Sequence, residues 1–475
     1  MSAAFLISTY ELGHQPFGLA SPAAWLRREG LDVTLVDLTK EKLDVSKIAD
    51  AGLVAFHLPM HTATRLAAPV IKKIRAANAS ARICAYGLYA PLNAEWLQSI
   101  GVTDVIGGEF EEELAAIARN ACTDAGPDVG RVVEAGLKTR PASAKTRPAL
   151  PRLQFLTPDR RGLPALDQYA SLRMGDGSRK VVGYTEASRG CRHLCRHCPV
   201  VPIYNGQFRV VSSEVVLADV AAQVAAGAEH ITFGDPDFFN GPTHAVRVVT
   251  ALHDAHPEIT YDVTIKVEHL LKHRELLPLL RSTGCLFVTS AVESLDDHVL
   301  SLLDKGHTRQ DFFDVASLCR ETRLTLAPTF VPFHPWTTIE NYCDLLDTLE
   351  RLDLVDHVAP IQLAIRLLVP EGSRLLELDD MRERAGAFDA TTLTYKWTHT
   401  DPRVDRLQRD VAATVGRRLV SERRTVFEEI TTLAHERAGL PRAAAPRASE
   451  GQSVPYRDEP WYCCAEPNPE QLTLV

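Results

Sequence analysis

The sequence predicts an α/β protein with two parallel-sheet domains, a helical cap and a flexible C-terminal tail. Two stretches, residues 1–122 and 181–372, alternate strand-like apolar runs with helix-like segments, which is the pattern of parallel sheets covered by helices. Residues 373–440 carry helical periodicity alone. We therefore expect domains at these three ranges, a linker at 123–180, and a second linker with a tail at 441–475.

The first domain is expected to contain five strands, at residues 3–8, 32–36, 52–56, 82–86 and 102–106. Its helices are expected at residues 21–29, 65–77, 94–99 and 109–120. Ser21 is interpreted as the N-cap of the first helix and Pro22 as its first residue, because proline is favoured at that position. This order of elements predicts a small doubly wound sheet.

The second domain is expected to contain six strands, at residues 181–187, 230–233, 261–265, 285–290, 325–330 and 358–368. Its helices are expected at residues 213–226, 242–255, 269–282, 296–303, 308–322 and 338–349. Six strand–helix repeats predict a parallel barrel whose active-site residues gather at the carboxyl ends of the strands. The cap that follows is expected to contain helices at residues 375–384 and 402–438.

Composition limits the classes of function. The net charge of −9 argues against a general nucleic-acid surface, which needs a basic field. The chain has no apolar run of the length that a transmembrane helix needs, so no membrane partner is expected. Ten cysteines, three of them in one compact motif, predict reduced thiols in a cytoplasmic protein rather than a disulfide framework.

That motif is Cys191, Cys195 and Cys198, with three and then two residues between the thiols. Thiolates are soft metal ligands, and three at this spacing can hold a [4Fe–4S] cluster that leaves one iron open. The alternative is a structural zinc site, which requires four ligands. His193 or His197 could then supply the fourth ligand.

The cysteine spacing and the repeats behind it resemble the radical SAM superfamily. The resemblance implies a partial (βα)6 barrel, a [4Fe–4S] cluster and S-adenosylmethionine as cofactors, and reductive cleavage of a carbon–sulfur bond. It also implies a small-molecule substrate and a one-electron donor such as flavodoxin or ferredoxin. Cys191, Cys195 and Cys198 would hold the cluster, and His197 would replace the aromatic residue that usually packs on the adenine.

Further binding positions follow from the same resemblance. Asp235 or Asp237, at the end of the second strand, would accept a hydrogen bond from the methionine ammonium group, although the sequence departs here from the usual Gly-Gly-Glu. Glu293, in a Gly-x-Glu-Ser-like turn, would face the ribose or the amino group. Lys305 would neutralise the methionine carboxylate, and Arg366 on the sixth strand would complete the cofactor-binding set.

The first domain resembles the Rossmann-like, cobalamin-binding domain that precedes many radical SAM barrels. The resemblance includes the strand order and the segment GGEFEEEL at residues 107–114. The Asp-x-His-x-x-Gly sequence that supplies a cobalt ligand is missing, and His57 and His61 follow the third strand instead of the second. Two interpretations stay open. Cobalamin binds without a protein ligand on cobalt, or the domain lacks the cofactor and shapes the substrate pocket.

The tail carries Cys463 and Cys464 within the sequence Cys-Cys-Ala-Glu-Pro. It resembles the radical SAM group named for a CCAEP or selenocysteine-containing CUAEP terminus. A tethered dithiol can chelate a soft element, so both residues are predicted to be catalytic. We expect transfer of an alkyl or 3-amino-3-carboxypropyl group to a thiol-bound soft-element or small-molecule substrate. The alternatives are cobalamin-dependent methyl transfer and a zinc-stabilised, non-enzymatic binding protein.

Overall fold

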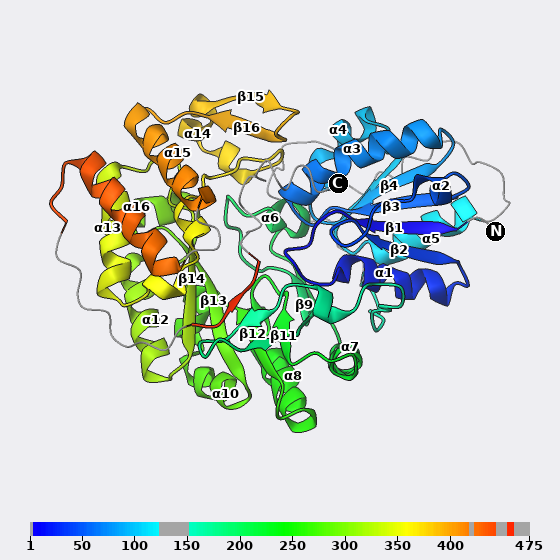
Figure 1. The fold of residues 1–475 in the computed structure, drawn as a ribbon, viewed down its shortest axis with the longest axis horizontal. Helices are drawn as coiled ribbons and strands as arrows, with labels where there is room; N and C mark the ends of the chain where they lie inside the picture. Colours follow the sequence, from blue (N-terminus) through cyan, green and yellow to red (C-terminus); the bar gives the residue numbers. More distant parts are fainter. Residues whose placement is uncertain (1–2, 123–151, 418–421, 443–453, 460–475) are drawn as a thin grey trace.

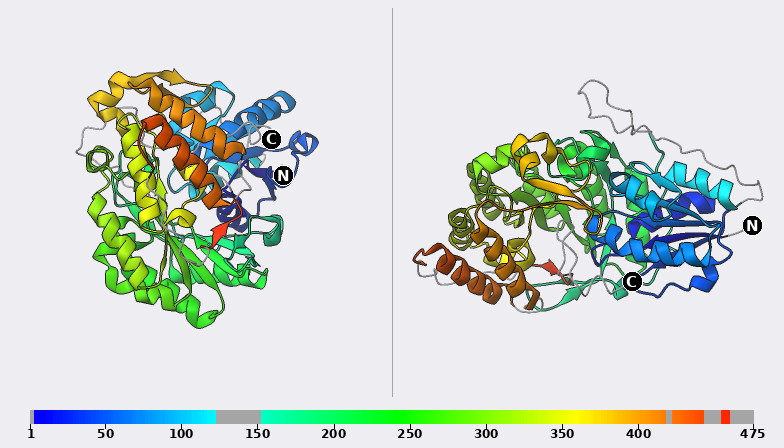
Figure 2. Two further views of the ribbon diagram at one scale, coloured as in Figure 1. Left: turned by 60° about the vertical axis from the view of Figure 1, so that its left-hand side comes forward. Right: turned by 90° about the horizontal axis from the view of Figure 1, so that it is seen from above.

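The computed structural model describes residues 3–122, 152–417, 422–442 and 454–459. These residues form two lobes, with the N-terminal domain in one and the second domain and cap in the other (Figure 1). Two further views show the last helices on the side of the second lobe that faces away from the N-terminal domain (Figure 2). The expected α/β fold class is confirmed.

The N-terminal domain is built on a five-stranded parallel sheet in the order β2-β1-β3-β4-β5. Its strands are β1 (Ala4–Ser8), β2 (Val33–Asp37), β3 (Leu53–His57), β4 (Arg82–Tyr86) and β5 (Asp104–Ile106). Every residue of β1 and β3 is buried, because helices cover both faces. One face carries α1 (Phe17–Arg28) and α5 (Glu111–Cys122), and the other carries α2 (Val45–Ile48), α3 (His61–Ala77) and α4 (Ala94–Ser99).

Helix α1 begins at Phe17, about one turn before the expected start at Ser21, so that prediction is wrong. Pro22 lies inside the helix and has no N–H group to donate to the carbonyl of Gly18. The hydroxyl of Tyr86 donates to that carbonyl instead, at 2.9 Å. A tertiary hydrogen bond thus satisfies the acceptor that proline leaves unpaired.

The described half of the expected linker, residues 152–180, packs against both domains. The Arg160 guanidinium donates to both carboxylate oxygens of Asp219 in the second domain, at 3.0 and 2.9 Å. The Tyr169 hydroxyl donates to Asp37 of the first domain at 2.9 Å. This half is therefore a fixed connection, and residues 123–151 lie outside the described part of the chain.

The second domain contains a five-stranded parallel sheet in the order β8-β11-β12-β13-β14. The strands are β8 (Val182–Thr185), β11 (His230–Phe233), β12 (Thr260–Thr264), β13 (Cys285–Glu293) and β14 (Thr325–Phe330). The helices between and after them are α7 (Ser213–Ala225), α8 (Pro242–Ala255), α9 (Val267–Lys272), α10 (Leu277–Ser282), α11 (Asp297–Leu302), α12 (Arg309–Glu321) and α13 (Ile339–Arg351). The sheet curves into a partial barrel with its helices outside (Figure 1).

The expected sixth strand at residues 358–368 is wrong. A 3-10 turn, Pro360–Leu363, occupies the start of this described segment. A single parallel bridge between Phe333 and Arg366 is what continues the sheet there. Proline cannot donate to a strand ladder, which accounts for the loss of regular pairing at this edge.

The cap contains α14 (Asp379–Arg384), α15 (Pro402–Arg417) and α16 (Arg423–Ala438). The expected single helix at 402–438 is therefore two helices, and α16 packs against both α13 and α15. An antiparallel hairpin, β15 (Ala385–Asp389) and β16 (Thr394–Trp397), was not predicted. Among the described residues, none of the helices has the length and apolar character needed to cross a membrane.

Candidate active site at the carboxyl ends of the barrel strands

The cysteine motif lies in the loop that follows β8, at the carboxyl end of the first barrel strand. A short strand, β9 (Ser188–Gly190), leads directly into Cys191 and pairs antiparallel with β10 (Phe208–Val210). Helix α6 (Val200–Tyr204) begins two residues after Cys198. The three thiols are therefore held between a paired strand and a helix, not on a free loop.

Two residues fix the entry into this loop. Gly190 has φ +76°, and a Cβ there would lie 2.4 Å from the ring of Tyr204, so the bend requires glycine. Asp235, which follows β11, accepts hydrogen bonds from the Ala187 amide at 2.9 Å and from the Ser188 hydroxyl. The loop is thus tied to the next strand of the barrel.

The Cys198 thiol requires a metal to become a thiolate at neutral pH. Cys191 and Cys195 are buried, and Cys198 is partly buried. Burial, and then the neighbouring Cys195, raise the pKa of Cys198 to about 12. A free thiol there would keep its proton at neutral pH, whereas binding of iron displaces the proton and stabilises the thiolate.

The spread of the donor atoms favours a cluster over a single zinc ion. In the described part of the chain, the donor atoms that lie within 4.8 Å of one another belong to Cys191, His193 and Asp237, not to the three cysteines. Three sulfurs on one zinc ion, with Zn–S bonds of about 2.3 Å, would lie about 3.8 Å apart. The three cysteine sulfurs are therefore not all within 4.8 Å of one another, which is a wider spread than one zinc ion would give.

The described residues supply no fourth thiolate near the loop. The described cysteines outside the motif all lie buried within other elements: Cys84, Cys122, Cys285, Cys319 and Cys343. The imidazole of His193 faces Asp237 at 3.4 Å and Glu268 at 3.6 Å. A set of three thiolates leaves one iron for a chelating ligand, as the predicted binding of S-adenosylmethionine requires.

Two buried lysines lie against the motif. Lys266, which follows β12, donates to the Cys195 sulfur at 3.9 Å and is 7% exposed. Lys305 is 3% exposed, and its positive charge acts on both Cys195 and Cys198. Three thiolates bring negative charge into a buried site, and these ammonium groups offset part of it.

We expect Lys266→Met to lower the reduction potential of the reconstituted cluster. At roughly 6 Å and an effective dielectric constant of ~20, one charge contributes about 3 kcal/mol, which corresponds to roughly 120 mV for a one-electron couple. Redox titration followed by electron paramagnetic resonance measures this shift. The control is Lys272→Met, because Lys272 is exposed on α9. Equal potentials in the two variants would contradict the assignment.

Glu293 ends β13 in a conformation that is unusual for a side-chain-bearing residue. Its φ of +70° lies in the left-handed region, and the pairing of β13 with β14 shifts register beside it. The carboxylate contacts His197 Nε2 at 3.1 Å and Lys305 Nζ at 3.4 Å. Burial opposes ionisation, but Lys305 and His197 outweigh it and lower the pKa of Glu293 to about 2. These three predicted residues therefore form one charged group beside the cysteines.

The two predicted aspartates have different environments. The Asp235 carboxylate accepts its hydrogen bonds from Ala187 and Ser188, and it therefore supports the cluster loop. The Asp237 carboxylate lies 2.6 Å from His269 Nδ1 and 3.4 Å from His193 Nε2. Burial is outweighed by these two histidines, which lower the pKa of Asp237 to about 2. His269 has no signal in the sequence beyond its place after the third strand.

The buried carboxyl group of Asp235 should make the stability of the protein fall as the pH rises. Burial raises its pKa to about 7, against the hydrogen bonds from Ser188 and Ala187, so the native state keeps a proton that the unfolded state releases near pH 4. The free energy of unfolding should fall by about 2 kcal/mol between roughly pH 5.5 and pH 7 through this group. Asp235→Asn should flatten that fall in anaerobic thermal unfolding across this range. Parallel profiles for variant and wild type would refute the prediction.

The structure does not join Arg366 to this group. Its guanidinium donates to Asp405 on α15 at 2.7 Å and to the Trp397 carbonyl at 2.7 Å, and it stacks over the Trp397 ring at 3.6 Å. These contacts hold the cap against the barrel. A role for Arg366 in cofactor binding has no support from its surroundings.

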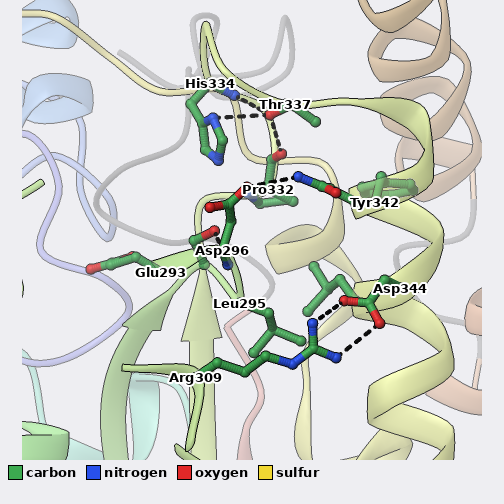
Figure 3. A pocket seen from close by; sticks show the side chains of 12 residues that line it. Glu293, Leu295, Asp296, Arg309, Pro332, His334, Thr337, Tyr342 and Asp344 are labelled. Carbon is green, nitrogen blue, oxygen red and sulfur yellow. Dashed lines mark hydrogen bonds and ion pairs between the residues drawn. The ribbon is translucent and has the colours of Figure 1, made fainter. Parts of the chain in front are cut away.

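A pocket of about 140 Å³ opens beside Glu293, at the carboxyl ends of β13 and β14 (Figure 3). Arg309 and Asp344 form an ion pair in its wall, with donor–acceptor distances of 2.5 and 2.9 Å. The lining residues are Glu293, Ser294, Leu295, Asp296, Arg309, Pro332, His334, Thr337, Asn341, Tyr342, Asp344 and Leu345. Their polar groups can orient a ligand that carries several hydrogen-bonding atoms.

Arg189, two residues before Cys191, connects the cluster loop to the N-terminal domain. Its guanidinium contacts Glu111 at 2.6 Å, Glu109 at 3.6 Å and Glu186 at 2.6 Å. Burial is the main cause that raises the pKa of Glu109 to about 7. The positive charge of Arg189 lowers this pKa, and the negative charge of Glu111 raises it. The acidic segment at 107–114 was predicted for its resemblance alone, and sequence reasoning missed that it pairs with this arginine.

The two histidines discussed for cobalt, His57 at the end of β3 and His61 at the start of α3, are both buried. The His57 ring is 8% exposed, and its Nδ1 contacts Glu11 at 2.6 Å. A Cβ at Gly18 would lie 2.0 Å from the ring, which shows how closely α1 covers it. His61 is 1% exposed at the start of α3. Glu11 therefore engages His57 Nδ1, and both histidine rings are shielded from solvent. Cys463 and Cys464 lie outside the described residues.

Comparison with known proteins supports the barrel assignment. Residues 185–352 match the family model described as the radical SAM superfamily. The tRNA-2-methylthio-N(6)-dimethylallyladenosine synthase of Chlorobaculum tepidum is 26% identical over 204 residues, which are 37% of this chain and 41% of that protein. The chain thus spans about two fifths of the length of this curated relative.

Two solved structures share the fold. TsrM from Kitasatospora setae, a radical S-adenosylmethionine methyltransferase with cobalamin and a [4Fe–4S] cluster bound, aligns with a TM-score of 0.57 and 19% identity over 74% of this chain and 71% of its own. OxsB, a cobalamin-dependent S-adenosylmethionine radical enzyme, aligns with a TM-score of 0.67 and 13% identity over 92% of this chain and 72% of its own. At these identities the likeness concerns the fold.

Proposed function

This chain carries a radical SAM domain at residues 185–352, and on that premise we propose that it cleaves S-adenosylmethionine reductively to drive radical group transfer. The observation that carries the proposal is the set of three motif cysteines beside the buried Lys266 and Lys305. When bound, a [4Fe–4S] cluster supplies the single electron that breaks a carbon–sulfur bond, and the protein orients the reactants. A one-electron donor must reduce the site.

The charged group around Glu293 would bind the cofactor. Glu293 is ionised and already oriented by Lys305 and His197, so it can accept hydrogen bonds from an ammonium or ribose hydroxyl. Lys305 has further N–H donors for a carboxylate. The His197 ring can stack on adenine, and the adjoining pocket offers polar groups to the rest of the ligand. Water exclusion follows from the burial of this group.

The group transferred would be an alkyl or 3-amino-3-carboxypropyl group, and the acceptor a thiol-bound soft element or a small molecule. The chemical motive is the Cys463–Cys464 pair, because adjacent thiols bind soft elements such as trivalent arsenic well. Soft-element binding would place the acceptor on the protein itself. A tethered acceptor site raises the effective concentration of the substrate near the radical.

Cobalamin-dependent methyl transfer is the second candidate. The observation that favours it is the likeness in fold to TsrM and OxsB across both domains. His57 and His61 are buried in the N-terminal domain, so this candidate is the form in which cobalamin binds without a protein ligand on cobalt. The two candidates differ in a measurable quantity, since the second requires stoichiometric cobalamin in the active protein.

Anaerobic purification, reconstitution and reduction with S-adenosylmethionine test the main proposal. We expect a brown protein with about four irons per chain. Release of 5′-deoxyadenosine or of 5′-methylthioadenosine then identifies which bond breaks. A colourless protein with one zinc and no iron would establish the non-enzymatic alternative instead.

The C463A/C464A double variant tests the role of the tail. It should retain cluster binding and S-adenosylmethionine cleavage but lose transfer to a soft-element acceptor, tested with sodium arsenite. The matched control is Cys343→Ala, which changes a buried thiol on α13. Normal transfer by the double variant would remove the thiol-bound substrate from the proposal.

A further inference from the structure

The pocket beside Glu293 contains polar side chains that the charged group around Glu293 does not use. His334 follows β14, Asp296 directly precedes α11, and Asn341 lies on α13, and all three line the pocket. In Figure 3 the carboxylate of Glu293 points away from His334 and Asp296. We refer to His334, Asp296 and Asn341 as the His334 group, which forms a separate end of the pocket.

The contacts of His334 determine which ring nitrogen carries the hydrogen. The Thr337 hydroxyl donates its one hydrogen to the Pro332 carbonyl at 2.8 Å, because a carbonyl can only accept. The Thr337 oxygen also accepts from the His334 amide at 2.9 Å and lies 3.1 Å from His334 Nδ1. Since the hydroxyl hydrogen is already used, Nδ1–H is the donor in that last contact. In the neutral ring, Nε2 therefore carries a lone pair.

The Nε2 atom of His334 faces the pocket without a partner. The residue is 4% exposed, and no hydrogen bond or ion pair with another described residue engages Nε2. Figure 3 shows this atom on the side of the ring that faces Asp296. Burial lowers the pKa of His334 to about 4, although the charge of Asp296 raises it, and His399 of the cap lowers it further. The ring is therefore neutral at physiological pH, and its lone pair is available.

Asp296 supplies the charge of the His334 group. Its Oδ1 accepts from the backbone amides of His298 and Val299 at 2.8 and 3.4 Å. Its Oδ2 accepts from Asn341 Nδ2 at 2.9 Å. All three donors are uncharged N–H groups, so they stabilise the carboxylate but leave its negative charge in place.

The other acidic residues of the pocket are paired with cations. Glu293 lies 3.4 Å from Lys305 Nζ, and Asp344 forms two contacts with Arg309, at 2.5 and 2.9 Å. Among the described residues, Asp296 is the carboxylate of the pocket that has no basic partner. The end of the pocket at the His334 group thus has an excess of negative charge.

Three hydrogen-bond acceptors of the His334 group are open to a ligand. They are His334 Nε2, the remaining lone pairs of Asp296 Oδ2, and Asn341 Oδ1, since Asn341 turns its amide Nδ2 toward Asp296. A primary ammonium group has three N–H donors, one positive charge and no acceptor. It therefore matches the site in the number of hydrogen bonds, in their direction and in charge. An anion would meet only acceptors and a like charge.

We propose that the His334 group binds the primary ammonium group of a small-molecule amine. The pocket opens next to Glu293 at the carboxyl ends of β13 and β14, which places the amine beside the proposed cofactor site. This inference rests on the proposed function, because it names the class of the small-molecule acceptor as a primary amine. Binding of the amine is a separate property that can be measured without turnover.

Isothermal titration calorimetry of the full-length reconstituted protein tests the site with propylammonium chloride. We expect saturable one-to-one binding of propylammonium. Tetramethylammonium chloride should bind at least tenfold more weakly, because it has the charge but no N–H donors. Sodium propionate should not bind. Tetramethylammonium binding as tight as that of propylammonium would overturn the proposal, since charge alone would then account for the attraction.

S-adenosylmethionine serves as the competitor, because it carries an ammonium group of its own. We expect propylammonium to bind equally well at saturating S-adenosylmethionine, since the Glu293 carboxylate points away from the His334 group. Loss of propylammonium binding under these conditions would place the amine in the ammonium site of the cofactor. That result would contradict the assignment to His334.

Two substitutions each remove one feature of the His334 group. His334→Asn keeps an N–H donor for Thr337 and removes the Nε2 acceptor, and Asp296→Asn keeps a cap for α11 and removes the charge. Each should weaken propylammonium binding about tenfold. The matched control is His298→Asn, which changes an exposed side chain on α11 and should bind as the wild type does. Thermal unfolding checks that each variant is folded. Wild-type affinity in both variants would refute the site.

Nuclear magnetic resonance gives a signal from the site in the wild-type protein. The chain is labelled with ¹³C at histidine Cε1, and His334→Asn identifies the His334 signal by its absence among the 17 histidines. Propylammonium should shift this signal and leave that of His298 unchanged. Binding heat without a shift of the His334 signal would place the amine elsewhere in the protein.

Cofactor cleavage separates this inference from the function beneath it. Binding of propylammonium to reconstituted protein that does not cleave S-adenosylmethionine would remove the proposed function and leave the ammonium site. Cleavage of S-adenosylmethionine without binding of propylammonium would remove the ammonium site and leave the proposed function. The two failures therefore have different signatures in the same preparation.

Discussion

Serine in place of Cys191, Cys195 or Cys198 is expected to abolish cluster binding and S-adenosylmethionine cleavage. Each thiolate would hold one iron, and an alkoxide from serine is too basic to replace it at neutral pH. The three residues lie in one tight loop between β9 and α6, so no described neighbour can move in as a substitute thiolate. Iron content and nucleoside release measure the effect.

The matched control is Cys319→Ala, which changes a buried thiol on α12 outside the loop. It should keep full iron content. Its stability should fall only slightly, because the substitution removes a single sulfur atom from the packed core. A motif variant that retained iron and cleavage would contradict the cluster assignment. Retention of one zinc by the motif variants would favour the zinc-stabilised alternative.

Arg189→Met should produce the second large effect, a loss of roughly 3–5 kcal/mol of stability, because it leaves buried carboxylates without their cation. Glu111 and Glu109 belong to the N-terminal domain, and Glu186 precedes the cluster loop. Thermal unfolding under anaerobic conditions measures the loss. We also expect lower iron content, because the arginine holds the strand that enters Cys191.

Two further variants distinguish charge pairing from packing. Arg192→Met is the control, since the Arg192 guanidinium stacks on Phe208 and lies outside the acidic group. Adding Glu109→Gln and Glu111→Gln to Arg189→Met removes two of the unpaired charges and should recover part of the stability. No recovery would mean that the side chain acts through its volume and not its charge.

Local patterns in the sequence were sufficient to predict the architecture. Alternating strands and helices predicted both parallel sheets, because each element needs a buried face and that need is visible as periodicity. The cysteine spacing predicted a metal-binding loop, since three ligands within eight residues meet wherever that loop lies. The prediction of a sixth strand was wrong. Pro360 has no N–H group to donate to a neighbouring strand, and the apolar periodicity of the segment does not reveal this.

Tertiary structure decided how the site is assembled. The Tyr86 hydroxyl donates to the Gly18 carbonyl that Pro22 leaves unpaired inside α1, and no local feature of the sequence indicates this partner. Glu293 meets His197 and Lys305 through a left-handed turn at a register shift. Arg366 contacts Asp405 of the cap, although its place in the sequence predicted a cofactor ligand.

Local sequence patterns establish two parallel-sheet domains and a loop with three closely spaced cysteines. Long-range contacts add that Arg189 joins this loop to the first domain, and that β17 (Tyr456–Arg457) pairs with β6 (Leu172–Arg173) in the connecting segment. Burial and pairing of charges depend on residues that are far apart in the chain. Their energies arise from removal of water between elements, which periodicity and spacing do not encode.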